Sequence, residues 1–267
     1  MKTRIITGVI GAAALILLII FADPRIVAAV IFLASLIGLF EFYSVTKLIK
    51  LKPLLLCGLL GAFIITAANF KLIPDEYVPA VFLLWIFLIF LVMLIFNQKI
   101  DIKAASLTVF SVLYIPNLFS YISMVLFMPL GKILIWFVLA GAFATDTFAY
   151  FTGTFLGKHK LCPHISPKKS IEGLIGGTIG CGILFPLMGY FFNEFLGAGL
   201  LILPLVPIGI ITALFSQFGD LCASMIKRSF SVKDYGKILP GHGGIMDRCD
   251  SLIFVAPLIY FLFGIFY

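Results

Sequence analysis

Long apolar runs constrain this chain more than any other feature of its sequence. A helix needs about 20 consecutive apolar residues to cross the hydrocarbon layer of a membrane. The sequence holds nine such candidates, at about residues 4–22, 26–46, 53–70, 77–97, 104–128, 131–152, 171–193, 199–226 and 251–267. A soluble fold of 267 residues, 62% of them hydrophobic, could not hide so much apolar surface. The sequence therefore predicts an all-α, polytopic integral membrane protein with about nine transmembrane helices.

Basic residues concentrate in alternate loops, and this asymmetry predicts the orientation of the chain. Lys and Arg collect on the cytoplasmic side of membrane proteins. With the N-terminus inside, 16 of the 19 basic residues fall on the inner side, and only Arg25, Lys71 and Lys132 fall outside. We therefore expect a cytoplasmic N-terminus and a place in the cytoplasmic (inner) membrane. The formal net charge of +7 is then a topology signal that needs no nucleic-acid partner.

Polar residues concentrate in two predicted inner loops, 153–170 and 227–250, and in the helices that enter them. We expect a single membrane-embedded domain over residues 1–267. In this scheme residues 1–128 are mainly scaffold helices, and residues 131–267 carry an active site that faces the cytoplasm. Glu41 is the exception in the first half, and its position near the inner end of the second run favours an interfacial carboxylate.

Asp146 falls inside the sixth apolar run, in the stretch GAFATDTFAYFTG. A carboxylate at such a depth costs on the order of 2.5–3.5 kcal/mol on insertion scales, so it normally faces a polar cavity. The alternative is a shallow aspartate that makes a hydrogen bond between packed helices. Both interpretations are compatible with the sequence.

Asp220 begins a polar stripe on the eighth run. Asp220, Ser224, Lys227 and Arg228 stand at i, i+4, i+7 and i+8, so a helix places them on one face. Lys227 and Arg228 alone could be membrane-end anchors. Asp220 lies one to two turns deeper in the membrane, where a role as a membrane-end anchor does not explain it. A carboxylate that binds a divalent metal ion, followed on the same face by basic side chains, is suited to binding a nucleoside triphosphate.

The stretch LPGHGGIMDRCDS, residues 239–251, precedes the last apolar run. Asp247 and Asp250 stand where that helix should begin, and acidic residues in a first turn are favoured by the helix dipole. Gly241, Gly243 and Gly244 surround His242, and glycines let backbone amides turn towards an anion. The stretch therefore predicts either a phosphate-binding turn or a capped helix start, and His242 fits both.

The other inner loop ends in SPKKSIEGLIGGTIG. Ser170 is placed to N-cap the following helix behind Lys168 and Lys169, and a helix N-terminus behind two lysines suits a phosphate. The loop is not a P-loop, because no G-x-x-x-x-G-K-[ST] occurs. The glycines that follow, at 173, 176, 177 and 180, have the spacing of close helix packing.

Taken together, these motifs resemble the phosphatidate cytidylyltransferase family, also called CDP-diacylglycerol synthases. The similarity runs from Ser224 to Asp250, with the pattern S-x-x-K-R, four residues, and K-D-x-G-x-x-L-P-G-H-G-G-x-x-D-R-x-D. The TDTFAY and SPKKSIEG stretches also resemble the family, whereas the first half matches only in being membranous. Cys249 departs from the aliphatic residue or Thr that the family usually has at that position.

The resemblance implies that CTP and phosphatidic acid react to give CDP-diacylglycerol and pyrophosphate, with Mg²⁺ as the cofactor. We expect Asp220 and Asp247 to be the principal Mg²⁺ ligands, with Asp146 and Asp250 as candidates for a second cation or an outer shell. We expect Lys227 and Arg228 to act with these aspartates in catalysis. The expected contacts to the phosphates of CTP and lipid are Lys168, Lys169, Ser170, Ser224, Lys233, His242, Gly243, Gly244 and Arg248.

Two other functions are compatible with parts of this pattern. A CTP-dependent lipid or polyprenol kinase would use the same nucleotide site. A cation-coupled transporter would explain Asp146 and Asp220 as ion ligands within the membrane, but not the dense polar segment at 227–250. The predicted partners are CTP, phosphatidic acid and the lipid bilayer, and a homo-oligomer is compatible with the sequence.

Overall fold

The computed structural model describes residues 2–238, 241 and 243–266. The described chain forms two compact units, and each is described here by itself. The first comprises Met1–Met124 and Asp234–Asp247, and the second comprises Val125–Lys233 and Arg248–Tyr267. The segment 234–247 thus belongs with the N-terminal helices although it lies near the end of the chain.

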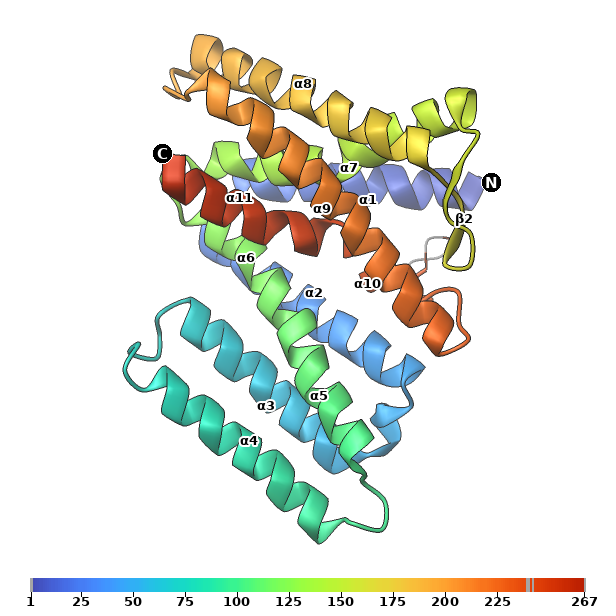
Figure 1. Ribbon diagram of the computed structural model, residues 1–267. Helices are drawn as coiled ribbons and strands as arrows, with labels where there is room; N and C mark the ends of the chain where they lie inside the picture. The colour runs from blue at the N-terminus through green and yellow to red at the C-terminus, as the bar shows by residue number, and fades with distance from the viewer. Residues whose placement is uncertain (1, 239–240, 242, 267) are drawn as a thin grey trace. The chain divides into compact units, whose positions relative to one another are not determined.

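The first unit is built from helices (Figure 1). Helices α3, α4 and α5 lie side by side. The unit contains α1 (Lys2–Phe21), α2 (Pro24–Val45), the short 3₁₀ helix η1 (Leu48–Lys50), α3 (Lys52–Asn69), α4 (Val78–Ile95), α5 (Ile102–Tyr114) and most of α6 (Pro116–Leu126).

Close packing in this unit depends on small residues of α3. The ring of Trp85 in α4 lies against Gly61, and its indole nitrogen donates a hydrogen bond to the Cys57 carbonyl at 2.8 Å. Asp101 N-caps α5 by accepting a hydrogen bond from the Ala104 amide at 2.8 Å. These hydrogen bonds satisfy polar groups within an otherwise apolar helical bundle.

The second unit contains α7 (Gly131–Leu156), α8 (Ile171–Leu196), α9 (Ile202–Ser229) and α11 (Leu252–Phe266). The short α10 (Met246–Cys249) begins in the first unit and ends in the second. Helix α8 packs along both α7 and α9 (Figure 1). The predicted glycine packing is confirmed, because a Cβ on Gly176 would collide with Thr152 and one on Gly180 with the ring of Phe148.

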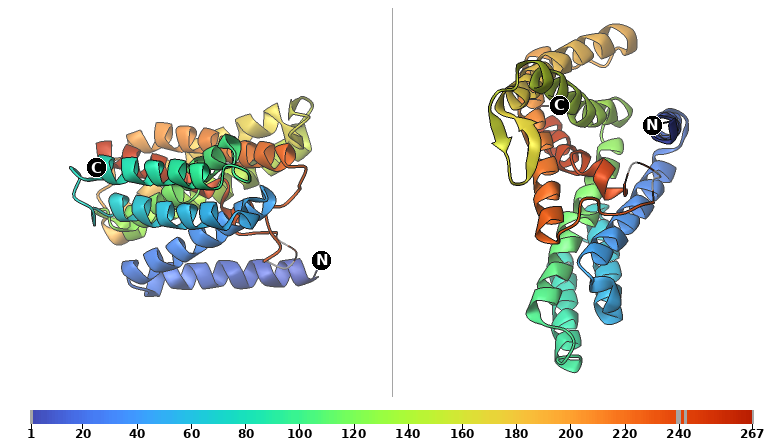
Figure 2. Two further views of the ribbon diagram at one scale, coloured as in Figure 1. Left: turned by 90° about the horizontal axis from the view of Figure 1, so that it is seen from below. Right: turned by 90° about the vertical axis from the view of Figure 1, so that its right-hand side faces the viewer.

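A β-hairpin joins α7 to α8, inside a segment that the sequence suggested only as a loop (Figure 2). Strand β1 (Lys160–Cys162) pairs antiparallel with β2 (Ser166–Ser170), and Lys160 lies opposite Ser170. Helix α7 also continues to Leu156, four residues beyond the predicted end of its apolar run.

The predicted class, an all-α polytopic membrane protein, is confirmed. Seven helical segments of the described chain are long and apolar enough to cross a membrane, with α5 and α6 forming one of them: Pro24–Val45, Lys52–Asn69, Val78–Ile95, Ile102–Leu126, Gly131–Leu156, Ile171–Leu196 and Ile202–Ser229. Helix α11 is apolar but shorter, at 15 residues. The count of nine and the side of the N-terminus stay predictions.

Exposed apolar side chains agree with a lipid surrounding. Helix α4 has 18 residues and buries only Trp85 and Ile89 within the protein. Its other side chains, such as Leu84 and Leu94, are largely exposed. A soluble protein could not leave so large an apolar surface in water, so this helix is suited to contact with hydrocarbon.

Candidate functional site

An ion pair in the second unit joins the hairpin to α9. The ammonium group of Lys169 lies 2.6 Å from Oδ2 of Asp220, and the two side chains are only 20% and 28% exposed. The Lys169 ammonium also donates to the Gln217 carbonyl, one turn earlier on α9, at 3.3 Å. Charges that are partly withdrawn from water attract one another more strongly than exposed pairs do.

Local structure explains why Lys169, and not its neighbour, makes this pair. Ser170 is the N-cap of α8, since its extended backbone lets its hydroxyl accept a hydrogen bond from the Gly173 amide at 3.1 Å. The predicted helix cap is thereby confirmed. Lys168 and Lys169 precede it in β2, where successive side chains point to opposite faces. Lys168 is exposed, whereas Lys169 is half-buried.

Two further carboxylates share the electrostatic surroundings of Asp220. The charges of Asp220 and Lys169 both act on Asp146, although Asp146 is itself exposed. Burial raises the pKa of the Asp250 carboxyl to about 7, and the negative charge of Asp220 adds to this rise while Lys227 opposes it. The second unit therefore gathers three carboxylates, Asp146, Asp220 and Asp250, with the ammonium groups of Lys169 and Lys227. We call these five residues the acidic cluster.

The predicted stripe on α9 divides into two parts. The Ser224 hydroxyl donates to Oδ1 of Asp220 at 3.4 Å, and Lys227 is buried, with 8% of its surface exposed. Arg228 is exposed and its guanidinium donates to the Val232 carbonyl at 3.2 Å, just beyond the helix end. Lys227 thus belongs to the interior, while Arg228 supports the chain where it leaves α9.

Asp247 lies in the first unit, where it organises a turn. Its Oδ2 accepts hydrogen bonds from the backbone amides of Tyr235 at 2.8 Å and Gly244 at 3.0 Å. Gly243 has a φ of +86°, a left-handed conformation that favours glycine. A Cβ at Gly243 would also come within 2.8 Å of the same carboxylate oxygen. The glycines of this stretch therefore serve the turn around Asp247.

Glu41 is a partner of this turn that the sequence analysis missed. The side chain was expected at the membrane interface, but it is buried, with 5% exposed. Its Oε1 accepts from the Ile245 amide and its Oε2 from the Met246 amide, each at 3.0 Å. The only signal in the sequence was a carboxylate in a scaffold region otherwise poor in charge.

The remaining predicted phosphate contacts lie in varied surroundings. Lys233 and Arg248 are exposed in the second unit, as Lys168 is. Gly243 is half-buried and Gly244 is buried in the first. His242 lies outside the described residues.

Metal binding depends on how many carboxylates converge. Within the described residues, no three Asp, Glu, His or Cys side chains form a group that could hold a metal ion unaided. Mg²⁺ does not need such a cage, because it usually takes one or two carboxylates together with substrate oxygens and waters. The acidic cluster has three carboxyl groups and two ammonium groups, and an added divalent cation would favour the ionised form of these carboxyls.

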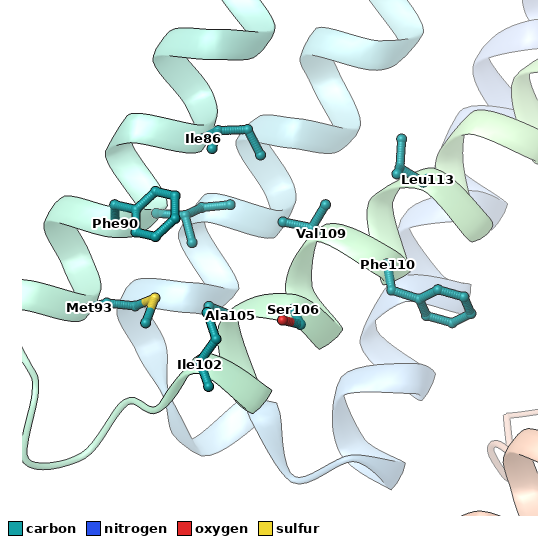
Figure 3. A pocket seen from close by; sticks show the side chains of 10 residues that line it. Ile86, Phe90, Met93, Ile102, Ala105, Ser106, Val109, Phe110 and Leu113 are labelled. Atoms are coloured by element: carbon teal, nitrogen blue, oxygen red, sulfur yellow. The ribbon is translucent and has the colours of Figure 1, made fainter.

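A separate apolar groove of about 440 Å³ lies between α4 and α5 in the first unit (Figure 3). Its lining is hydrophobic apart from Ser106, and it includes Phe90, Met93 and Val109. None of the predicted site residues lines it. The groove offers no group for phosphate chemistry.

The fold and the site together define a mainly helical membrane protein with carboxylates and lysines near Asp220. Comparison with known proteins makes this class specific. The chain belongs to the cytidylyltransferase family, whose model matches residues 2–266.

Individual relatives support the family over nearly the full length. A phosphatidate cytidylyltransferase of Staphylococcus epidermidis is 36% identical over 267 residues, with 98% of each chain covered. One of Bacillus subtilis is 33% identical over 277 residues, which cover 100% of this chain and 98% of the relative. One of Staphylococcus haemolyticus is 53% identical over 118 residues, and this match spans 44% of either chain.

Proposed function

We propose that this protein transfers the cytidylyl group of CTP to phosphatidic acid, with CDP-diacylglycerol and pyrophosphate as products. Membership of the cytidylyltransferase family and full-length similarity to phosphatidate cytidylyltransferases support this reaction. The structural observation that carries it is the acidic cluster, in which Asp220 pairs with Lys169 beside Asp146 and Asp250.

The reaction needs no nucleophile from the protein. An oxygen of the lipid phosphate attacks the α-phosphorus of CTP, a new P–O bond forms, and the bond to the β-phosphate breaks to release pyrophosphate. Both reactants are anions, so the protein must neutralise their repulsion and hold them in line. Lys169 and Lys227 supply fixed positive charge within the acidic cluster, and Lys168, Lys233 and Arg248 supply exposed positive charge for phosphates.

We propose Mg²⁺ as the cofactor, because carboxylates are ligands that it prefers and each unit offers one proposed ligand, Asp220 in the second unit and Asp247 in the first. A bound Mg²⁺ ion would supply positive charge to the phosphates of the reactants and to the pyrophosphate leaving group. Asp146 and Asp250 add negative charge around Asp220 and could serve a second cation or an outer shell. Ser224 donates to Asp220 and so helps to fix the direction of that carboxylate.

We further propose that the site faces the cytoplasm from the inner membrane. Most of the basic residues fall in the predicted inner loops. A lipid substrate can keep its acyl chains in the bilayer while its phosphate meets water-soluble CTP at such a surface. This placement brings the two substrates together without removing the lipid from the membrane.

Position-specific labelling of CTP tests the proposal. Purified protein in detergent is incubated with phosphatidic acid, Mg²⁺ and CTP labelled on either the α- or the γ-phosphate, and the lipids are then extracted. We expect the α-label in the lipid fraction and the γ-label in pyrophosphate. A lipid kinase would place the γ-label in the lipid and leave the α-label in CDP, and a transporter would label no lipid. Either of these results would contradict cytidylyl transfer.

A further inference from the structure

We propose that Glu41 is a positioning residue of the site, which fixes the turn at 243–247 and thereby the direction of the Asp247 carboxylate. The inference rests on the proposed function, in which Asp247 binds Mg²⁺. Every contact that carries it lies within the first unit.

Glu41 holds the turn by its backbone. Its two carboxylate oxygens accept hydrogen bonds from consecutive amides, those of Ile245 and Met246, at 3.0 Å each. These amides stand at the start of α10, where a helix leaves its first N–H groups without partners of its own. A side chain of α2 therefore supplies a cap that a neighbouring residue usually supplies.

Asp247 accepts hydrogen bonds from other backbone amides of the same segment. Its Oδ2 accepts from the amides of Gly244 and Tyr235, so the two carboxylates together bind four backbone amides of one segment. Charge-assisted hydrogen bonds of this kind are about twice as strong as neutral ones. The hydrogen bonds of Glu41 and of Asp247 thus involve the same short segment, so loss of the Glu41 hydrogen bonds should also change the orientation of the Asp247 carboxylate.

The segment fits closely around the Glu41 side chain. A Cβ on Gly236 or on Gly244 would collide with the Glu41 carboxylate. Met246 is fully buried, and its side chain would be 3.1 Å from a Cβ on Gly38, one turn before Glu41 on α2. Packing and hydrogen bonds therefore both fix the segment against one face of α2.

A purely structural role would need no carboxylate. Burying a charged group is costly unless it is paired or fully hydrogen-bonded, and an apolar residue at position 41 with a local cap would hold the fold more cheaply. The charge of Asp247 also acts on Glu41, so the acidic group of the turn and the acidic group of α2 lie close enough to interact. Such an arrangement suits a segment that presents a carboxylate to a cation.

Glu41→Asp separates geometry from charge. It keeps the carboxylate but shortens it by one methylene, so that it cannot reach both amides. Glu41→Gln keeps the length but leaves only one acceptor. Gly236→Ala places a methyl group against the same carboxylate without changing Glu41. Asp101→Ala is the matched control, because it removes a carboxylate cap from α5 in the same unit, away from the turn.

Hydrogen exchange of the full-length protein in detergent measures the hold on the turn and needs no turnover. We expect peptides that cover 243–249 to exchange at least about tenfold faster in Glu41→Asp, Glu41→Gln and Gly236→Ala, because the amides of Ile245 and Met246 lose hydrogen bonds to a charged group, each of which is equivalent to at least about a factor of ten. Exchange in α3 and α4 should be unchanged. Asp101→Ala should affect only peptides of α5. Wild-type exchange of the turn in the Glu41 variants would overturn the inference.

The Mg²⁺ dependence of cytidylyl transfer measures the consequence for the site. We expect the half-saturating Mg²⁺ concentration of Glu41→Asp to rise about tenfold or more, with partial recovery of the rate at high Mg²⁺. A merely structural role would lower the rate equally at every Mg²⁺ concentration, and that result would also overturn the inference. Failure of the wild-type protein to make CDP-diacylglycerol would instead refute the proposed function, and the exchange experiment would still decide the role of Glu41.

Discussion

The ammonium group of Lys169 lies 2.6 Å from a carboxylate oxygen of Asp220, and this pair joins the β-hairpin to α9. The contact brings together residues 51 positions apart, the distance from 169 to 220 in the chain. The charge of Asp220 also acts on Asp146 and Asp250, and Lys169 offsets this negative charge at Asp146. The hairpin therefore contributes a positive charge to the candidate site.

Replacing Lys169 by Met should impair the enzyme more than its surface charge would suggest. The change leaves Asp220 without its ion-pair partner and beside two like charges. We expect kcat/KM for CTP to fall at least about tenfold, equivalent to about 1.4 kcal/mol. Lys160→Met, in β1 of the same hairpin, removes an exposed lysine and should have little effect. Equal kinetics for the two variants would exclude Lys169 from the site.

Asp220→Asn and Asp247→Asn should each abolish most turnover while the protein stays folded in detergent. Asn keeps the shape of the side chain but removes the charge that a divalent cation needs. We expect losses on the order of 100-fold or more, as for other electrostatic groups at reacting centres. Asp75→Asn, an exposed carboxylate between α3 and α4, is the control. A near-wild-type rate at limiting Mg²⁺ in either variant would refute the metal assignment.

Arg228→Lys should lower turnover although it conserves charge. The guanidinium can bind a phosphate with two parallel hydrogen bonds, whereas a lysine acts as a point charge. The exchange also disturbs the hydrogen bond from Arg228 to the Val232 carbonyl. Turnover measured over a range of CTP and salt concentrations tests the prediction. Wild-type rates and CTP affinity at every salt concentration would leave Arg228 as a membrane-end anchor.

The orientation of the chain can be tested with single cysteines. The asymmetry of 16 to 3 among basic residues predicts that the hairpin lies inside and the loop between α3 and α4 outside. In a cysteine-free background, Asp75→Cys should react with a reagent confined to the outside, and Lys160→Cys should react only after permeabilisation. The opposite pattern would reverse the predicted topology.

Features set by neighbouring residues could be predicted from the sequence. The helical character, the cap by Ser170 and the glycine packing of α8 all depend on patterns a few residues long, and all are present in the structure. The sequence could not separate Lys168 from Lys169, because that distinction depends on the alternation within an unanticipated strand. Glu41 was missed for a different reason, since its partners lie about 200 positions away and no local pattern records them.

The distance in sequence between Glu41 and its partners also has a consequence for how the chain is made. Glu41 precedes Ile245 by 204 residues, and a ribosome that adds roughly 5–20 residues per second needs on the order of 10–40 s to span that interval. During this time the buried carboxylate has neither of the backbone amides that later bind it, so α2 must enter the membrane carrying an acid whose ligands do not yet exist. A chain that ends before residue 234 lacks both of these amides and also Gly236 and Gly244, which lie against the same carboxylate, so the surroundings of Glu41 are completed only when the last part of the chain has been made.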